Sequence, residues 1–429
     1  MHDVTAAIVR WAGPIGFALV LLLADGRPAA GRAAQDTQHW VGTWFASSTA
    51  RLDTATAGSQ SLLQVSNQTL RQIVHISVGG SRLRVVLSNT FGTAPLTVGA
   101  AGVALRDKDA AIVAASHRAL TFGGVARTAV PAGAILVSDP IDLAAPDFAD
   151  LAIDLYLPDD TAAMKSPITT HPAAWQTNYV SAPGNHTGAT ALPVQTTTAY
   201  VRGDGLPCAT WFFLARVEVM ASEQVGAVVT LGDSITDGTA STIDTNNRWP
   251  DQLARRFASS GMRIAVLNAG IGGNRVLMEG NGPSALARFD RDVAAQPGVT
   301  HVVVLEGIND IGQARRNPSP SAADLIAAHT QLIERAHARG IRIYGATLTP
   351  FEGANYWTPE GEAKRQALNE WMRTSHAYDA VFDFDKAVRD PDRPAQTLAR
   401  FDPGDHLHLN AAGYQAVAQT VDLSLFRVR

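Results

Sequence analysis

A serine in the middle of the chain and a histidine at position 408 have the neighbours that nucleophilic catalysis requires. Residues 231–238 read Leu-Gly-Asp-Ser-Ile-Thr-Asp-Gly and follow the apolar run 225–231. This order predicts a sharp turn from a buried strand into a helix, which holds the hydroxyl of Ser234 clear of the sheet. Because a serine hydroxyl is a weak nucleophile, it needs a base and a group that orients the base. Both residue types occur in Asp405-His-Leu-His408.

Ester cleavage needs a nucleophile, a base, a group that fixes the tautomer of the base, and donors for the developing oxyanion. We expect Ser234 as the nucleophile, His408 as the base and Asp405, three residues earlier, as the orienting acid. The expected oxyanion donors are the backbone amides of Ser234 and Gly273 and the side-chain amide of Asn309. Glycine at position 273 permits a close approach of the backbone because it has no Cβ.

Other interpretations of these residues stay open. His406 is a rival base, with Asp402 four residues earlier as its partner, although adjacent side chains such as Asp405 and His406 seldom face each other. Ser234 alone is also typical of a helix cap. A metal bound by Asp405, His406 and His408 would need further ligands at suitable spacing, and the sequence offers no such set. We therefore expect neither a metal nor another cofactor.

The rhythm of the chain from about residue 223 onward indicates an α/β domain. Apolar strands alternate with amphipathic helices, which predicts a parallel sheet covered on both faces. In such sheets, active sites gather at the carboxyl ends of the strands. The predicted strands are 225–231, 263–267, 299–305, 341–348 and 380–384. The predicted helices are 249–260, 321–339, one that begins at Pro359 with Thr358 as its cap, and 411–423.

The preceding part of the chain has a different rhythm. Leu70, Val74 and Ile76 alternate with polar residues such as Arg71, and a similar alternation runs through 151–157, where Asp154 is polar. Period-two patterns separated by turn residues predict an antiparallel β-sandwich of the jelly-roll kind. The expected organisation is a β-sandwich domain at 38–222 followed by the α/β domain at 223–429.

The four polar segments of the second half, taken together, resemble a known superfamily. Gly232-Asp-Ser234, Gly272-Gly-Asn274, Gly307-Ile-Asn309-Asp310 and Asp405-His-Leu-His408 are similar, in this order, to the four conserved blocks of the SGNH (GDSL) hydrolases. The resemblance covers about 223–429 and implies a flavodoxin-like α/β/α sandwich and a serine esterase. It implies for Ser234, Gly273, Asn309, Asp405 and His408 the roles given above. Residues 39–44, His-Trp-Val-Gly-Thr-Trp, resemble the start of the β-domain that precedes some secreted bacterial members.

Composition and the N-terminal segment bear on location. The formal net charge of −4 and the absence of a basic run with aromatic residues argue against nucleic-acid binding. A short apolar stretch at 11–24, followed by small residues, is typical of a secretory signal peptide ending near residue 34. We expect a secreted or periplasmic protein without stable membrane insertion after the signal is removed. Cys208 is the only cysteine, so no intramolecular disulfide forms.

The leading hypothesis is a serine esterase that hydrolyses O-acyl esters through an acyl-enzyme, with short acyl groups such as acetyl on a carbohydrate as the preferred substrate. The partner would be a small-molecule or polysaccharide ester. Tyr356 and Trp357, in the loop after the fourth strand, are candidate substrate contacts. The alternatives are a short-chain lipase, an arylesterase or an acyltransferase with the same catalytic residues, and a catalytically silent carbohydrate-binding protein.

Overall fold

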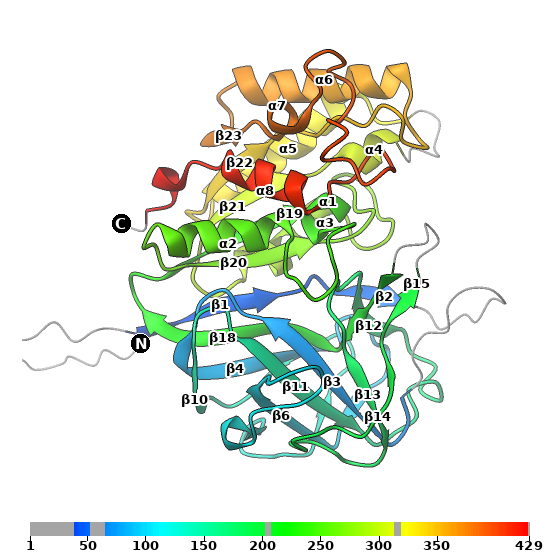
Figure 1. Ribbon diagram of the computed structural model, residues 1–429, viewed down its shortest axis with the longest axis vertical. Coiled ribbons are helices and arrows are strands. Elements are labelled where there is room, and N and C mark those ends of the chain that lie inside the picture. The colour runs from blue at the N-terminus through cyan, green and yellow to red at the C-terminus, as the bar shows by residue number, and fades with distance from the viewer. Residues whose placement is uncertain (1–37, 52–64, 202–206, 313–318, 428–429) are drawn as a thin grey trace, which may run out of the picture. The chain divides into compact units, whose positions relative to one another are not determined.

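A parallel sheet of five strands forms the framework of the C-terminal half (Figure 1). The computed structural model describes residues 38–51, 65–201, 207–312 and 319–427, so the predicted signal peptide lies outside the described residues. The strands are β19 (Gly226–Gly232), β20 (Ile264–Gly270), β21 (Val299–Leu305), β22 (Arg342–Ala346) and β23 (Ala380–Phe382). Their order, β20-β19-β21-β22-β23, is that of flavodoxin-like sheets. The predicted parallel α/β fold is confirmed.

Two groups of helices cover this sheet: α2 packs against α8, and α5 packs against α3 and α6. The longer helices are α2 (Trp249–Ser259), α5 (Ala322–His337), α6 (Pro359–Thr374) and α8 (Ala411–Gln419). The short ones are α1 (Ser234–Asp237), α3 (Ala285–Phe289), α4 (Ile308–Gly312) and α7 (Phe384–Val388), with one-turn segments at η1 (Ala114–Ser116), η2 (Asp290–Ala294) and η3 (Leu423–Phe426). The four long helices match the predicted ones. The short helices escape prediction because one or two turns show no apolar period.

The first half of the described chain is antiparallel, as predicted. Its main sheets have the orders β1-β18-β4-β10, with β9 beside β4, and β14-β13-β3-β11-β6-β7. Their strands are β1 (Gln38–Phe45), β3 (Gln68–His75), β4 (Gly80–Ser88), β6 (Ala100–Leu105), β7 (Arg118–Leu120), β9 (Ile135–Val137), β10 (Ile141–Ala145), β11 (Asp150–Leu157), β13 (Tyr179–Pro183), β14 (Val194–Thr197) and β18 (Leu214–Ser222). Smaller sheets pair β12 (Ile168–Pro172) with β17 (Thr210–Phe212) on one side and β2 (Thr49–Arg51) on the other, β5 (Leu96–Val98) with β8 (Thr128–Val130), and β15 (Tyr200–Val201) with β16 (Pro207–Cys208).

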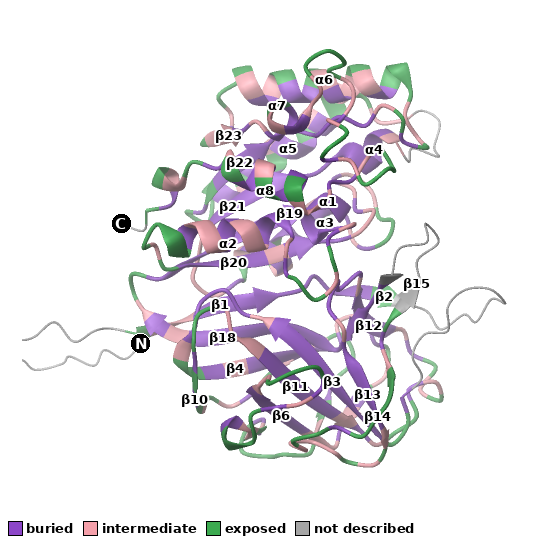
Figure 2. Ribbon diagram, viewed as in Figure 1, coloured by how far each residue is buried: buried purple, intermediate pink, exposed green. Residues whose placement is uncertain are grey.

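Strand β3 departs from a simple inside–outside alternation (Figure 2). The apolar set is buried as expected, but Arg71 is buried as well. Its guanidinium donates to both carboxylate oxygens of Asp154 on β11, at 2.7 Å each, and to the carbonyl of Ala110 at 2.6 Å. Polar residues on the second face of this strand are therefore covered and paired. Period-two patterning cannot reveal such a cover, because it depends on a distant loop.

The change from antiparallel to parallel pairing falls between β18, which ends at Ser222, and β19, which begins at Gly226. Both halves belong to one compact unit, Gln38–Arg429. The division into a β-sandwich domain and a hydrolase domain stays a prediction. Within the described residues, no helix combines the length and the apolar character that crossing a membrane requires.

The cap of helix α6 provides a test of the local sequence signals. Thr358 Oγ1 accepts the amide of Gly361 at 2.9 Å, and Pro359 occupies the first helical position. Replacing Thr358 by Ala removes this acceptor and is expected to lower the free energy of unfolding by about 1 kcal/mol. Thr358→Ser keeps the hydroxyl and should stay close to the parent in urea denaturation. Equal stability of the Ala and Ser variants would contradict the capping role.

Candidate active site

Three polar side chains from distant parts of the chain meet at the carboxyl end of strand β19. His408 Nε2 lies 2.8 Å from Ser234 Oγ, although 174 positions separate the two residues. His408 Nδ1 lies 2.5 Å from Asp405 Oδ2. Ser234 and His408 are almost fully buried, with exposed fractions of 5% and 6%. The structure thus brings together the serine, histidine and aspartate that the sequence singles out.

The hydrogen bonds of Asp405 fix the tautomer of His408. A carboxylate only accepts, so Nδ1 of the imidazole carries the proton and donates to Asp405, which leaves Nε2 to accept the hydroxyl proton of Ser234. The other oxygen of Asp405 accepts the amides of Leu407 at 3.0 Å and His408 at 2.9 Å. Partial burial raises the pKa of the Asp405 carboxyl, but the hydrogen bond and charge of His408 and these amides outweigh it and hold that pKa below its usual range. Asp405 therefore stays ionised beside the imidazole.

The nucleophile turn depends on close backbone packing. A Cβ on Gly232 would lie 2.2 Å from Thr236 Oγ1 and 2.6 Å from the carbonyl oxygen of Leu305, so only glycine fits at the end of β19. The side chain of Asp233 caps helix α1 by accepting the amide of Ile235 at 2.9 Å. This strand–turn–helix arrangement places Ser234 at the first position of the helix.

Gly273 and Asn309, from which further oxyanion donors are expected, lie in the segment after β20 and on helix α4. Gly273 has a φ of +74°, in the left-handed region that favours glycine. Asn309, on α4, donates from Nδ2 to the carbonyl of Asn274 at 3.0 Å. Within the described residues, neither the amide of Ser234 nor that of Gly273 donates to a protein acceptor.

The two candidate substrate contacts have different settings. The hydroxyl of Tyr356 lies 3.4 Å from Asn309 Oδ1, and its ring contacts Phe351 at a centroid distance of 6.0 Å. Burial and the negative charges of Asp233 and Asp405 raise the pKa of the Tyr356 phenol well above its usual value, so the hydroxyl stays protonated. Tyr356 therefore lies beside the side-chain amide of Asn309. Trp357 packs at the edge of the core, and no described contact joins it to Ser234 or His408.

His406, the rival base, lies elsewhere. Its Nδ1 pairs with Asp402 Oδ2 at 2.5 Å, which is the partner that the alternative assignment gave it. The His406 side chain is about half exposed, and its φ of +59° turns the backbone between Asp405 and His408. Only His408 of the two histidines hydrogen-bonds to Ser234.

Helix α8, which begins three residues after His408, is hydrogen-bonded to α2 and to the turn after α1. The hydroxyl of Tyr414, on α8, donates to the carbonyl of Thr239 at 2.6 Å. Arg256 on α2 donates to the carbonyls of Val421, at 2.8 Å, and Ala418. These bonds join α8 to α2 and to the turn after α1, and so tie the segment next to His408 to the segment that follows Ser234.

A buried arginine that the sequence analysis did not single out connects the loops beneath the site. The guanidinium of Arg288 donates to Asn274 Oδ1 at 3.0 Å, to the carbonyl of Ala269 at 2.7 Å and to the carbonyl of Gly232 at 3.0 Å. It also reaches Ser47 Oγ at 3.0 Å and Asp292 at 3.2 Å. One planar group thus joins the end of β19, the end of β20 and the segment after β1. No local sequence signal marks it, because its partners come from four separate segments.

Acidic side chains are buried next to this arginine. Glu306 is fully buried, its nearest cation is Arg288 at 3.8 Å, and neither carboxylate oxygen has a hydrogen-bond partner among the described residues. Burial and the charge of Asp233 raise the pKa of Glu306 well above its usual value. Burial likewise raises the pKa of Asp233 to about 7 and that of Asp310 to about 6. Glu306 is therefore a neutral, structural carboxyl beneath the nucleophile turn.

The described residues contain no group of three or more His, Cys, Asp or Glu side chains arranged to hold a metal ion.

Comparison with known proteins agrees with this geometry. Residues 230–416 match the model of the GDSL-like lipase/acylhydrolase family. No curated protein matches the chain. Among solved structures, a GDSL-like lipase from Bacteroides thetaiotaomicron VPI-5482 is 18% identical, with 46% of this chain and 85% of that chain covered and a TM-score of 0.35.

Two further structures cover the same share of this chain. An acetyl xylan esterase is 20% identical, with 45% of this chain and 96% of that chain covered and a TM-score of 0.35. A carbohydrate acetylesterase from Sinorhizobium meliloti is 13% identical, with 45% of this chain and 94% of that chain covered and a TM-score of 0.36. Similarities at this level do not bear on the substrate.

The segment 230–416 therefore belongs to the GDSL-like lipase/acylhydrolase family, which confirms the resemblance seen in the sequence. The protein is a serine hydrolase that acts on ester bonds. Its kinship with secreted members that carry an N-terminal β-domain stays a prediction.

The protonated state of Glu306 gives a pH-dependent prediction. The folded protein keeps a proton that the unfolded chain releases above pH 4.5, the ordinary Glu value. Stability is therefore expected to fall as pH rises above this value, by up to about 1.4 kcal/mol per pH unit for one proton. Glu306→Gln, which is neutral at all pH values, should have a flatter profile of unfolding free energy between pH 5 and 8. Glu334→Gln, on the exposed face of α5, serves as the control, and equal slopes for both variants would contradict the neutral carboxyl.

Proposed function

We propose that Ser234, His408 and Asp405 are the catalytic residues of an esterase that hydrolyses O-acyl esters through an acyl-enzyme. The observation that carries this proposal is the 2.8 Å contact between His408 Nε2 and Ser234 Oγ, in a histidine whose other nitrogen is held by Asp405. A serine whose proton can pass to a correctly oriented imidazole is an activated nucleophile.

In the first half of the reaction, Ser234 Oγ attacks the carbonyl carbon of the ester while its proton moves to His408 Nε2. The negative charge that develops on the carbonyl oxygen is stabilised by hydrogen bonds from the amides of Ser234 and Gly273 and the side chain of Asn309. The ionised Asp405 stabilises the imidazolium that forms. When the tetrahedral intermediate collapses, the C–O bond to the alcohol breaks and His408 returns the proton to the alcohol oxygen.

In the second half, water replaces the alcohol. His408 takes a proton from the water as its oxygen attacks the acyl carbon, and the same donors stabilise the second oxyanion. Collapse releases the carboxylic acid and returns the proton to Ser234 Oγ. In each half of the reaction the imidazole of His408 acts first as a base and then as an acid. The reaction needs no group other than those described.

We further propose a short acyl group, such as acetyl, on a carbohydrate as the substrate. Tyr356 supports the short acyl group, because its half-buried ring stands beside Asn309 and its hydroxyl remains protonated next to the proposed oxyanion donors. An aromatic wall this close to the reacting carbonyl limits the length of the acyl chain. The typical signal-peptide pattern at 1–34 supports a secreted or periplasmic location, where polysaccharide esters are accessible.

The catalytic assignment predicts a specific pattern of losses. Ser234→Ala should lower the turnover of p-nitrophenyl acetate by at least about 10³-fold, because the nucleophile is removed, and His408→Ala should do the same. His406→Ala is the matched control: it removes a histidine two positions away that pairs with Asp402, and should keep turnover within about twofold. A fluorophosphonate probe should label the parent stoichiometrically and Ser234→Ala not at all. Unchanged turnover in Ser234→Ala would contradict Ser234 as the nucleophile. Equal losses in the two histidine variants would contradict His408 as the base.

The substrate proposal predicts a preference that Tyr356 sets. The ratio of kcat/KM for acetyl over butyryl esters should exceed tenfold in the parent, and Tyr356→Ala should reduce it by about tenfold, because one or two methylenes in a pocket are worth about 1–3 kcal/mol. Each acyl group should be tested both as its p-nitrophenyl ester and as an ester of a xylo-oligosaccharide. A parent that prefers octanoyl esters would indicate a lipase. Ester products formed with an added alcohol, in place of free acid, would indicate acyl transfer.

A further inference from the structure

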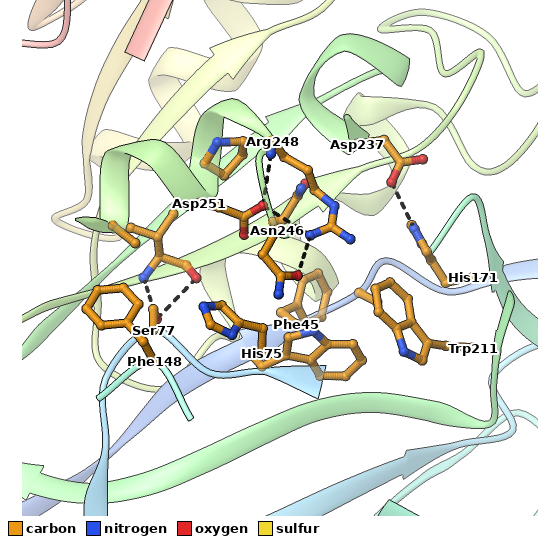
Figure 3. Close-up of a pocket in the computed structure, with 16 residues that line it drawn as sticks. Phe45, His75, Ser77, Phe148, His171, Trp211, Asp237, Asn246, Arg248 and Asp251 are labelled. Atoms are coloured by element: carbon orange, nitrogen blue, oxygen red, sulfur yellow. Dashed lines mark hydrogen bonds and ion pairs between the residues drawn. The ribbon is translucent and has the colours of Figure 1, made fainter. Parts of the chain in front are cut away.

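A histidine from the antiparallel half of the chain contacts the helix that begins at the nucleophile. His171, on β12, is buried, and its Nε2 lies 3.0 Å from Oδ1 of Asp237, the last residue of α1. Its Nδ1 lies 2.8 Å from the carbonyl oxygen of Ser47. The two side chains face each other across the edge of a cleft with about 630 Å³ of empty space, part of it open to solvent (Figure 3). Both are buried to the same degree, with side-chain exposures of 4%.

The two bonds of His171 define how the proton is shared. A backbone carbonyl only accepts, so Nδ1 carries a proton and donates to Ser47. Asp237, when ionised, also only accepts, so the contact at Nε2 holds one further proton between the imidazole and the carboxylate. The pair is therefore a charge-assisted hydrogen bond in a buried setting, the stronger kind. It fixes the orientation of the Asp237 carboxylate.

The second oxygen of Asp237 holds the loop that supplies the proposed oxyanion donor. Oδ2 accepts the amide of Gly272 at 3.1 Å, and the carbonyl of Gly272 accepts Nδ2 of Asn281 at 3.0 Å. The amide of Gly273 belongs to the same peptide group as this carbonyl. The peptide that presents the Gly273 amide is thus held on both sides, by Asp237 before it and by Asn281 at its carbonyl oxygen.

The packing around Gly270 shows how closely helix α1 and this loop fit. A Cβ on Gly270 would lie 2.2 Å from the backbone nitrogen of Asp237. The end of β20 therefore packs directly on the backbone of α1, next to the loop that Asp237 holds through the amide of Gly272. Displacement of about 1 Å at a reacting group is enough to cost about 10²-fold in rate.

We propose that His171 is a positioning residue for ester hydrolysis, acting through Asp237 and Gly272 on the amide of Gly273. The inference rests on the proposed function and extends it, because it makes a side chain of the antiparallel half part of the machinery that holds the oxyanion loop. Ser47 contributes a second connection, since its hydroxyl bonds to Arg288, and Arg288 bonds to Asn274. The segment after β1 and strand β12 together support the loop from below.

The test compares kcat and KM in purified full-length variants. His171→Ala and Asp237→Ala are each expected to lower kcat for p-nitrophenyl acetate by about ten- to a hundredfold with KM changed less than about threefold, because oxyanion donors act mainly in the transition state. The double variant should be no slower than the worse single variant, since both changes break one chain of bonds. Asp237→Asn provides rescue: its oxygen can accept from Gly272 while its NH₂ donates to a neutral His171, so kcat should stay within about threefold of the parent.

The matched control is His75→Ala. His75 lines the same cleft and pairs with a carboxylate, Asp150 on β11, at 2.7 Å, but its partner is not on α1. This variant should keep kcat within about twofold. The proposal is overturned if His171→Ala behaves like His75→Ala, or if Asp237→Asn loses as much activity as Asp237→Ala.

Failure of the positioning role can be distinguished from failure of the proposed function. If the parent neither hydrolyses esters nor reacts with the fluorophosphonate, the proposed function has failed. If the parent is active and the His171 and Asp237 variants are as fast, only the positioning role has failed. Should His171→Ala not fold, as judged by its thermal transition, the comparison of Asp237→Ala with Asp237→Asn decides alone.

Discussion

The hydrogen bond between Ser234 and His408 is the constraint to which the rest of the site conforms. It joins the start of α1 to the loop before α8, and each end is fixed by its own element. The nucleophile end is fixed by a turn in which only glycine fits at position 232. The base end is fixed by Asp405, which binds the imidazole with one oxygen and two amides with the other. Both ends are therefore set before a substrate arrives, which is the physical basis of preorganised catalysis.

Buried charged side chains near this hydrogen bond pair with backbone groups of the loops that carry Ser234 and Gly273. Arg288 neutralises part of the acidic cluster and at the same time satisfies the carbonyls at the ends of β19 and β20. Buried polar groups are tolerated only where hydrogen bonds replace lost water, and a guanidinium with five donors does this for several loops at once. Glu306 is the exception, since its carboxyl is buried without such bonds and gives up its charge. The loops of the site are thus joined by the hydrogen bonds of one buried arginine.

The sequence predicts the strands, the longer helices and the meeting of Ser234, His408 and Asp405, for identifiable reasons. Strands β19 and β21 are largely apolar, the caps of α5 and α6 follow standard signals, and Asp405 lies three residues before His408 within one turn. Such patterns are local. The sequence analysis did not single out Arg288 and His171, because all hydrogen-bond partners of their side chains except Asp292 lie 14 to 241 positions away, and no periodicity or spacing encodes those distances. The burial of Arg71 was missed for the same reason. Asp237 could have been singled out from the sequence, because it stands three positions after Ser234. Its bond to Gly272, however, forms only when the loop after β20 folds beside it.

The fastening of α8 to α2 and to Thr239 has a consequence for how the protein loses order. Ser234 and His408 lie on separate segments of backbone, and these side chain–carbonyl bonds contribute to their alignment. Loosening of those bonds would part them while the central sheet, and with it most of the far-ultraviolet dichroism, persists. The rate of ester hydrolysis should therefore detect this local loss of structure earlier than a spectroscopic measurement of secondary structure does.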